Sequence, residues 1–217
     1  LTASNRKSLG DEVVDFGSGL LNAEGRDVVV IDGGDTAMDC VRTAIRQKAN
    51  SVTCLYRRDR ANMPGSQREV ANAEEEGVDF RWLSAPQAFL GDNQVRAVQA
   101  QKIHLGQPDA TGRQVPQIIE DSSHEIPADL VIKALGFDPE DIPTMFGAPE
   151  LEVSKWGTIG VDWRTMMTNL PGVFAAGDII RGASLVVWGV RDGRDAAESI
   201  HSYIMAQSEA PRAAAGA

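Results

Sequence analysis

The sequence predicts an α/β protein in which a parallel β-sheet with covering helices is followed by an antiparallel β-meander and a second α/β segment. Three observations predict this class. A run of β-branched residues at 28–31 passes through a glycine pair into an amphipathic helix at 35–48. A second β-rich run at 51–56 completes a strand–helix–strand unit, for which a right-handed crossover is expected. Residues 88–125 then alternate between short β-like segments and turns, which is typical of antiparallel strands.

The other elements follow from capping, turn and periodicity signals. Ser66 and Glu69 form a capping-box pattern that opens a helix, and Gly77 ends that helix. The remaining expectations are a strand at 80–83, turns at 91–93 and 108–109, a buried strand at 129–134, a strand at 158–161, a strand and turn at 172–178, and a helix at 184–204.

The composition restricts the classes of function. The 217 residues carry a formal net charge of −10, which argues against nucleic acid or an anionic membrane as a partner. The sequence lacks an apolar run of about 18 residues, so we expect no membrane span. Cys40 and Cys54 belong to no close Cys/His set, so we expect no metal or iron–sulfur site within this chain and a reducing, cytoplasmic environment. Because the sequence begins with leucine, we expect the natural polypeptide to start further upstream.

The glycine turn after residue 31 predicts a dinucleotide site of the Rossmann type. In such a strand–turn–helix, N–H groups at the start of the helix bind a pyrophosphate. The residues expected to contribute are Gly33, Gly34, Asp35, Thr36 and Ala37. Gly34 and Ala37 match the fingerprint Gly-x-Gly-x-x-Gly/Ala in register, whereas Asp32 stands where its first glycine belongs. The alternative is a tight turn that binds no ligand.

Two adjacent arginines at the end of the second strand indicate which nucleotide is bound. Arg57 follows Gly34 by 23 residues, and Arg58 stands beside it. At this point of the architecture an acidic residue selects NAD, whereas arginine accepts the 2′-phosphate of NADP through forked, charge-assisted hydrogen bonds. The sequence therefore predicts an NADP(H) site. The alternative is that both arginines are ordinary solvated side chains.

Several motifs together carry a resemblance to a known family. Residues 173–178, Val-Phe-Ala-Ala-Gly-Asp, resemble the second flavin-binding signature of flavoproteins with two dinucleotide-binding domains. With the other motifs, residues 1–207 are similar to the small (β) subunit of bacterial NADPH-dependent glutamate synthase. These other motifs are Tyr56-Arg57-Arg58-Asp59, Met63-Pro64, Ala134-Leu135-Gly136-Phe137 and Leu185-Val186-Val187-Trp188.

The resemblance implies a domain plan and a set of flavin contacts. Residues 1–24 would connect from a missing half of an FAD-binding domain, residues 25–134 would form an NADPH-binding domain, and residues 135–207 would close the incomplete, Rossmann-like FAD-binding domain. The Ala-rich residues 208–217 are expected to form a disordered tail. The implied FAD contacts are Gly136, Gly177, Asp178, Val186, Val187 and Trp188. A plain turn at Asp178 and ordinary core packing of the last three side chains are the alternatives.

The resemblance also implies an activity. The chain would belong to an electron-input module in which NADPH reduces FAD, and electrons would leave through iron–sulfur clusters to an FMN in a large partner subunit. There, L-glutamine and 2-oxoglutarate would become two molecules of L-glutamate. A direct hydride step needs no acid–base residue, so we assign no catalytic residue.

Two other classes of function stay open. One is a related electron-input flavoprotein, similar to dihydropyrimidine dehydrogenase or to a ferredoxin–NADP transhydrogenase. The other is a non-catalytic nucleotide-binding or assembly module in which Asp32 abolishes binding.

Overall fold

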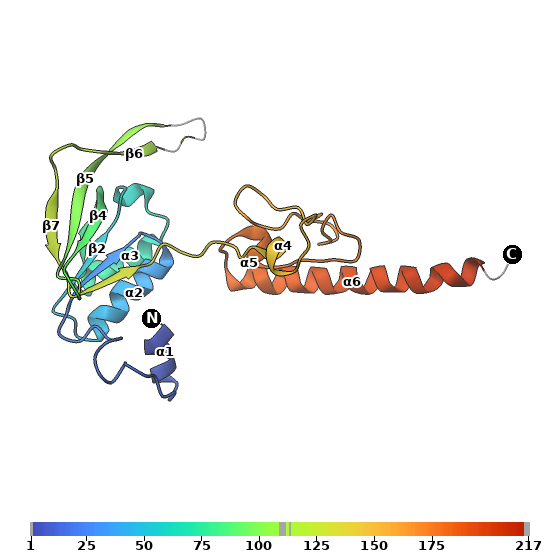
Figure 1. Ribbon diagram of the computed structural model, residues 1–217, viewed down its shortest axis with the longest axis horizontal. Coiled ribbons are helices and arrows are strands. Elements are labelled where there is room, and N and C mark those ends of the chain that lie inside the picture. Colours follow the sequence, from blue (N-terminus) through green and yellow to red (C-terminus); the bar gives the residue numbers. More distant parts are fainter. Residues whose placement is uncertain (1, 109–111, 113, 215–217) are drawn as a thin grey trace. The chain divides into compact units, whose positions relative to one another are not determined.

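In the computed structural model, the chain forms two compact units, Leu1–Leu135 and Gly136–Ala217 (Figure 1). The structure describes residues 2–108, 112 and 114–214, with side chains described as far as residue 208.

The first unit contains a four-stranded parallel sheet with the strand order β3-β2-β1-β8. Its strands are β1 (Asp27–Ile31), β2 (Ser51–Leu55), β3 (Asp79–Arg81) and β8 (Leu130–Lys133). The two central strands have continuous runs of buried residues, as expected for strands that are covered on both faces. The four predicted strands are therefore confirmed to within one or two residues at each end.

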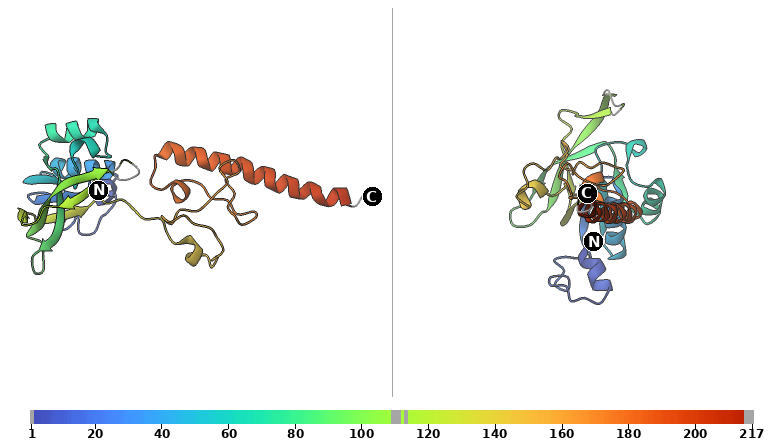
Figure 2. Two further views of the ribbon diagram at one scale, coloured as in Figure 1. Left: turned by 90° about the horizontal axis from the view of Figure 1, so that it is seen from above. Right: turned by 90° about the vertical axis from the view of Figure 1, so that its right-hand side faces the viewer.

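Alternate residues of β1 face two different layers. Val28 and Val30 pack against helix α2 (Asp35–Arg46), whereas Val29 and Ile31 pack against strand β5 (Ala97–Pro108). The helices and the meander thus cover opposite faces of the sheet (Figure 2). The residues of α2 that face the sheet are Ala37, Met38, Val41 and Ala44, which recur at helical spacing.

The meander begins earlier than predicted, at Ser84. It consists of β4 (Ser84–Leu90), β5, β6 (Gln114–Ile118) and β7 (His124–Pro127). The first part of β5 lies between β4 and β7, and its second part pairs with β6. The predicted turn at Gly91 is present with a φ of +140°, and a Cβ atom there would lie 1.9 Å from the Gln94 carbonyl oxygen. Asp109, in the second predicted turn, lies outside the described residues.

Other helical segments of the first unit connect these layers. Helix α1 (Thr2–Ser8) buries none of its residues, whereas Ala23, just before β1, is buried in the core beneath α2. A 3₁₀ turn, η1 (Arg60–Asn62), and helix α3 (Gln67–Glu75) follow β2. The helix predicted from Ser66 to Gly77 is therefore confirmed.

The second unit has a small core beneath a long helix. Its helices are α4 (Ile142–Met145), α5 (Asp178–Arg181) and α6 (Val186–Ala214). The buried core residues are Leu151, Ile159, Met166, Ile180 and Ala196. The strand predicted at 158–161 is wrong, because Ile159 forms only an isolated bridge with Val153. Phe174 likewise forms an isolated bridge with Met167, so the predicted strand before Gly177 is no regular strand.

The last helix begins near the predicted position but extends further. The structure shows α6 helical to Ala214, where we expected disorder from residue 208 onward. Residues 215–217 of the expected tail lie outside the described residues. Across the described chain, no helix has both the length and the apolar character that crossing a membrane requires.

Candidate nucleotide-binding site

The glycine turn lies at a point where the strand order reverses. From β1 the chain continues through α2 to β2 on one side, whereas the strand on the other side, β8, comes only after the meander. In open α/β sheets, ligands bind outside the carboxyl ends of the strands at this reversal. Residues 32–34 lie directly after β1 and therefore occupy the expected binding position.

The structure shows which residues of the turn need to be glycine. Asp32 has a φ of +126°, a backbone conformation that favours glycine. Gly33 is required for packing, because a Cβ atom there would lie 2.8 Å from the Tyr56 ring. Gly34 has a φ of −84° and a ψ of 176°, which other residues adopt readily. The missing first glycine of the fingerprint is thus the position with the strictest backbone requirement.

Helix α2 begins immediately after the turn. Asp35 and Thr36 are exposed in its first turn, and Ala37 is buried against the sheet. The Ala37 N–H donates to the Gly34 carbonyl at 3.0 Å, whereas the N–H groups of Asp35 and Thr36 are available to an anion. Gly34 is the N-cap residue, and its side-chain position offers no competing acceptor.

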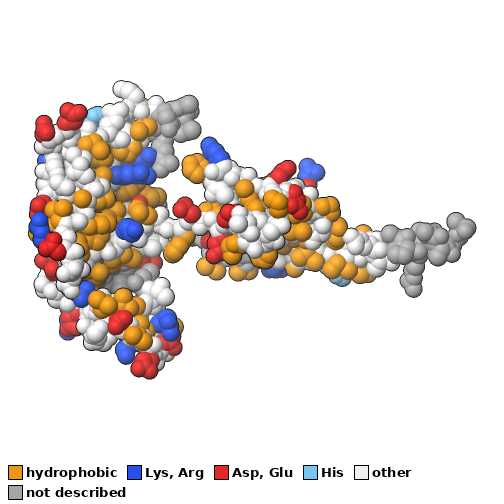
Figure 3. Space-filling model, viewed as in Figure 1, with side chains coloured by type: hydrophobic (Ala, Val, Ile, Leu, Met, Phe, Trp, Pro, Cys, Tyr) orange, Lys and Arg blue, Asp and Glu red, His pale blue; other side chains and the backbone are white. Residues whose placement is uncertain are grey.

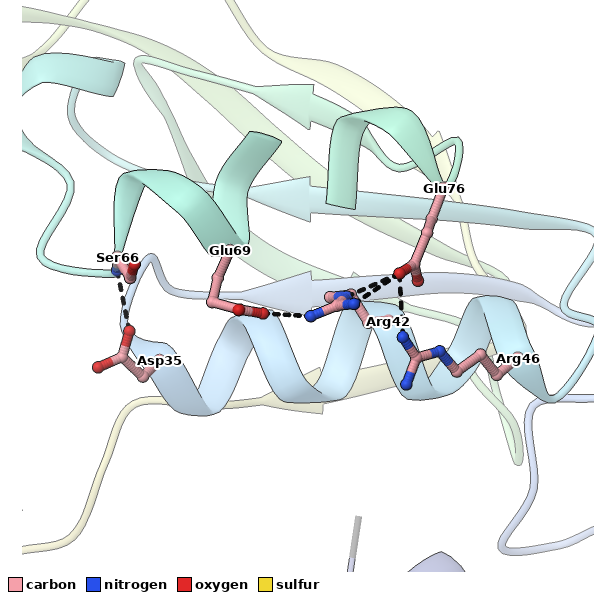
Figure 4. A network of polar contacts seen from close by, with 6 residues as sticks. All are labelled: Asp35, Arg42, Arg46, Ser66, Glu69 and Glu76. Atoms are coloured by element: carbon pink, nitrogen blue, oxygen red, sulfur yellow. Dashed lines mark hydrogen bonds and ion pairs between the residues drawn. The ribbon is translucent and has the colours of Figure 1, made fainter. Parts of the chain in front are cut away.

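The segment before α3 is bound to the glycine turn. The Gly65 N–H donates to the Gly33 carbonyl at 2.9 Å, and a Cβ atom at Gly65 would lie 2.9 Å from that same oxygen. The Ser66 N–H donates to Asp35 Oδ1 at 2.9 Å. This contact corrects the predicted capping box, because the Ser66 side chain makes no capping hydrogen bond. Asp35 on α2 binds the start of α3 instead (Figure 4).

An ionic network holds α2 against α3 (Figure 4). Arg42 pairs with Glu69, and its Nη2 lies 2.7 Å from Glu76 Oε1. Arg46 also pairs with Glu76, at 3.0 Å. The hydrogen bond from Arg42 holds the pKa of Glu76 below its usual range, against the opposing effect of burial. The network fixes the two helices whose first turns border the glycine turn.

Arg57 and Arg58 follow β2, as predicted. Neither guanidinium forms an ion pair with any residue that the structure describes, whereas the neighbouring Arg60 pairs with Glu74 at 2.7 Å. Arg58 is half-buried, and its Nε is buried without a hydrogen-bond partner. Arg57 is exposed, so its guanidinium is open to solvent and to an anion.

A cleft of about 490 Å³ opens at the carboxyl ends of the parallel strands. Asp32 from the glycine turn and Arg57 both line it, so the structure brings these two sequence-predicted features together. The other lining residues are Ile31, Leu55, Tyr56, Ala85, Pro86, Phe89, Lys133 and Leu135. The sequence analysis missed Lys133, which ends β8 directly beside Ile31 of β1. Arg58 and residues 33–37 are outside the lining of this cleft.

Both cysteines are free thiols that lie buried in the first unit. Cys54 is fully buried under the turn, and its thiol donates to the Asp32 carbonyl at 3.3 Å. Burial raises the pKa of the Cys54 thiol to about 12, so it stays protonated. Cys40 is buried on α2. The part of the chain that the structure describes contains no group of three His, Cys, Asp or Glu side chains placed to hold a metal.

In the second unit, the predicted flavin contacts lie on turns and at helix starts. Gly177 has a φ of +82° and precedes Asp178, the exposed first residue of α5. Asp178 lines a pocket of about 480 Å³ together with Phe137. Gly136, with a φ of +85°, precedes Phe137 and is exposed.

The side chains in the first turn of α6 are exposed. Val186 is 83% exposed, Val187 is 65% exposed, and Trp188 is also exposed. Core packing within this chain therefore does not explain the apolar side chains of Val186 and Val187. Apolar side chains at a helix start that face solvent are available to a ligand or to another protein segment.

The sequence matches the pyridine nucleotide-disulphide oxidoreductase family over residues 5–210, so the chain belongs to this family. It is 67% identical over 215 residues to the glutamate synthase (NADPH) small chain of Azospirillum brasilense, which covers 99% of this chain and 45% of that protein. It is 68% identical over 204 residues to a putative glutamate synthase (NADPH) small chain of Cereibacter sphaeroides, and this match covers 94% of this chain and 49% of that protein. The chain thus spans about half the length of these curated relatives.

A solved structure agrees with this assignment. The thioredoxin reductase of Lactococcus lactis matches with a TM-score of 0.67 at 25% sequence identity, covering 84% of this chain and 54% of that one. The predicted fold class, a Rossmann-like α/β fold with a parallel sheet and an antiparallel meander, is confirmed.

Proposed function

We propose that this chain carries the NADPH-binding domain and part of the FAD-binding domain of an electron-input flavoprotein. The observation that carries the proposal is one cleft, at the reversal of strand order, that is lined by both Arg57 and Asp32, the first residue of the glycine turn. Similarity over nearly the whole chain to NADPH-dependent glutamate synthase small chains supports NADPH as the electron donor.

The residues of the first unit suit NADP(H). The free N–H groups at the start of α2 bind the pyrophosphate, and the unpaired guanidinium groups of Arg57 and Arg58 bind the 2′-phosphate. Lys133 adds a second cation to the cleft that Arg57 lines. Asp32 is the one acid in that lining, and it opposes the binding of an anion there.

The second unit contributes to an FAD site. The Asp178 carboxylate would accept hydrogen bonds from flavin ribityl hydroxyls, and the N–H groups of Val186 and Val187 would face the flavin ring. Trp188 would contribute its side chain, because its N–H donates to the Leu185 carbonyl at 2.9 Å. A bound FAD would supply the redox chemistry, taking a hydride and releasing single electrons, and the residues of this chain would bind and orient it.

The natural polypeptide then passes its electrons to a partner. By similarity, we propose that this partner is a large glutamate synthase subunit, reached through iron–sulfur clusters and FMN. The overall reaction would convert L-glutamine, 2-oxoglutarate and NADPH into two molecules of L-glutamate.

Coenzyme choice tests the nucleotide site. Arg57→Ala combined with Arg58→Ala removes the proposed 2′-phosphate contacts, so the preference for NADPH over NADH should disappear. Each charge-assisted hydrogen bond contributes about 1.5–3 kcal/mol, so NADPH affinity should fall on the order of a hundredfold or more. Fluorescence titration of the natural polypeptide with both nucleotides measures the change.

A matched control removes the same amount of positive charge elsewhere in the first unit. Arg6→Ala with Arg96→Ala deletes two exposed arginines that pair with Asp11 and Glu125. This variant should keep its preference for NADPH. Equal affinities for NADPH and NADH in the unmodified protein would refute the assignment of Arg57 and Arg58.

A further inference from the structure

A buried ion pair links two elements of the second unit. Arg181, the last residue of α5, places its Nε 2.5 Å from Asp192 Oδ2 and its Nη2 2.7 Å from Asp192 Oδ1. The Asp192 side chain on α6 is 1% exposed. The bidentate geometry fixes the guanidinium plane relative to the carboxylate plane.

Two tryptophan rings hold the same guanidinium. The Arg181 guanidinium carbon lies 4.7 Å from the centroid of the Trp163 ring and 5.2 Å from that of Trp188. Both distances are within the range of a cation–π contact. Trp188 is in the first turn of α6, so Arg181 contacts that turn directly.

The ion pair also borders the turn before α5. Helix α5 runs from Asp178 to Arg181, so the arginine that pairs with Asp192 lies one helical turn after Gly177. The main-chain N–H of Arg181 donates to the Gly177 carbonyl at 3.2 Å. Arg181 therefore contacts Gly177 through its main chain, and Asp192 and Trp188 through its side chain.

We propose that Arg181 and Asp192 are positioning residues that fix the Gly177–Asp178 turn against the first turn of α6, so that both present their polar groups to one flavin. The inference rests on the proposed FAD site. An apolar pair of similar size would often stabilise a core equally well. Such an apolar pair forms no directional hydrogen bonds, however, and would leave the Gly177–Asp178 turn free to change its orientation relative to α6.

The test separates stability from positioning. In the natural full-length polypeptide, Arg181→Met with Asp192→Leu replaces the ion pair by apolar side chains, and Arg181→Lys keeps the charge but loses the fork. For each variant, thermal unfolding is measured without FAD, and the dissociation constant of FAD is measured by flavin fluorescence. In a variant that unfolds within a few degrees of the parent, FAD should bind at least about tenfold more weakly.

A readout without cofactor is hydrogen exchange in this chain. The Ile180 amide, which donates to the Gly177 carbonyl at 3.1 Å, should exchange at least about tenfold faster in the apolar variant, because the ion pair no longer fixes the turn. The control is Arg96→Met with Glu125→Leu, an exposed pair at 3.1 Å in the first unit, which should change neither FAD binding nor this exchange.

The outcomes are distinct. FAD affinity that falls only in step with thermal stability across the variants, or an unchanged Ile180 exchange rate, would show a merely structural pair and overturn the proposal. An unmodified natural polypeptide that binds no FAD would instead overturn the proposed function, before any variant is compared.

Discussion

Asp32 occupies a backbone conformation that non-glycine residues rarely adopt. Its φ of +126° lies outside the regions open to most L-residues, and conformations of this kind cost about 1–3 kcal/mol. Its carboxylate points along the turn, with Oδ2 only 3.4 Å from where a Cβ atom of Gly34 would be. No described residue donates a hydrogen bond to that carboxylate in the structure, so nothing turns it away from the proposed pyrophosphate position.

Replacing Asp32 with glycine should therefore improve both folding and binding. We expect the free energy of unfolding to rise by about 1–3 kcal/mol as the backbone strain is removed. A carboxylate within about 5 Å of a phosphate costs roughly 3 kcal/mol at an effective dielectric near 20, so NADPH affinity should rise around a hundredfold. Urea unfolding and NADPH titration of the Asp32→Gly variant measure the two effects.

Asp32→Asn separates the two causes, because it removes the charge and keeps the Cβ atom. It should recover most of the affinity and little of the stability, although asparagine tolerates positive φ better than most residues. Comparable NADPH dissociation constants for the unmodified protein and the glycine variant would contradict the repulsion argument.

At the scale of single residues, the sequence predicts the element on which a residue lies better than the distant residues that it contacts. It predicts the glycine turn and places Arg57 at the end of β2, because both follow from the local order of strand, turn and helix. It does not predict that Tyr56 packs against Gly33, nor that Lys133 lines the same cleft as Arg57. Both contacts join residues that are distant in the chain, and only the sheet register brings them together.

At the scale of elements, the capping box at Ser66 and Glu69 shows how tertiary contacts override a local pattern. The pattern correctly marks the start of α3, but Glu69 pairs with Arg42 of α2 rather than with the backbone of its own helix. The predicted strand at 158–161 is wrong for a related reason. A strand requires a neighbouring strand, and within the second unit Ile159 finds only a single bridging residue.

The α2–α3 network predicts a pH dependence of stability. Hydrogen bonding from Arg42 lowers the pKa of Glu76, and Arg46 contributes to the shift. A lowered pKa means that the stabilisation is fully present above the unfolded value of about 4.3 and is lost as the pH falls through the lower folded value. The Arg42→Ala variant should unfold more easily at neutral pH and lose less stability on acidification than the parent.

Urea midpoints measured from neutral pH down to about pH 3, below the unfolded pKa of a glutamate, provide the measurement. Arg6→Ala is the matched control, since Arg6 forms an exposed pair with Asp11 at 3.0 Å on the surface. It should leave both the midpoint and its pH dependence nearly unchanged. A parent and an Arg42→Ala variant with parallel pH profiles would show that the pairing of Glu76 does not contribute.

At the scale of the whole molecule, the second unit exposes many large apolar side chains (Figure 3). Phe137 is 92% exposed, and the start of α6 is similarly open. The others in this unit include Met145, Phe146, Trp156, Trp163, Leu185, Val190, Ile200 and Ile204. Exposed apolar surface of this extent marks an interaction site. We propose that a segment present in the longer relatives covers it, since the chain spans 45% of the Azospirillum brasilense protein.

The same surface governs cofactor content. A ligand site buries most of the surface of its ligand. Asp178 and the first turn of α6 would cover only part of the surface of a flavin. The sequence also contains one glycine-rich strand–turn–helix, at residues 28–46, which we assign to NADPH.

We therefore expect this chain, purified alone, to carry substoichiometric FAD and to bind NADPH through its first unit. The natural polypeptide should carry one FAD at this site. Visible flavin absorbance relative to protein content measures the difference, and retained NADPH binding controls for folding. A full flavin spectrum in this chain alone would mean that residues 136–214 enclose the flavin without further protein, and that their exposed apolar face serves another partner.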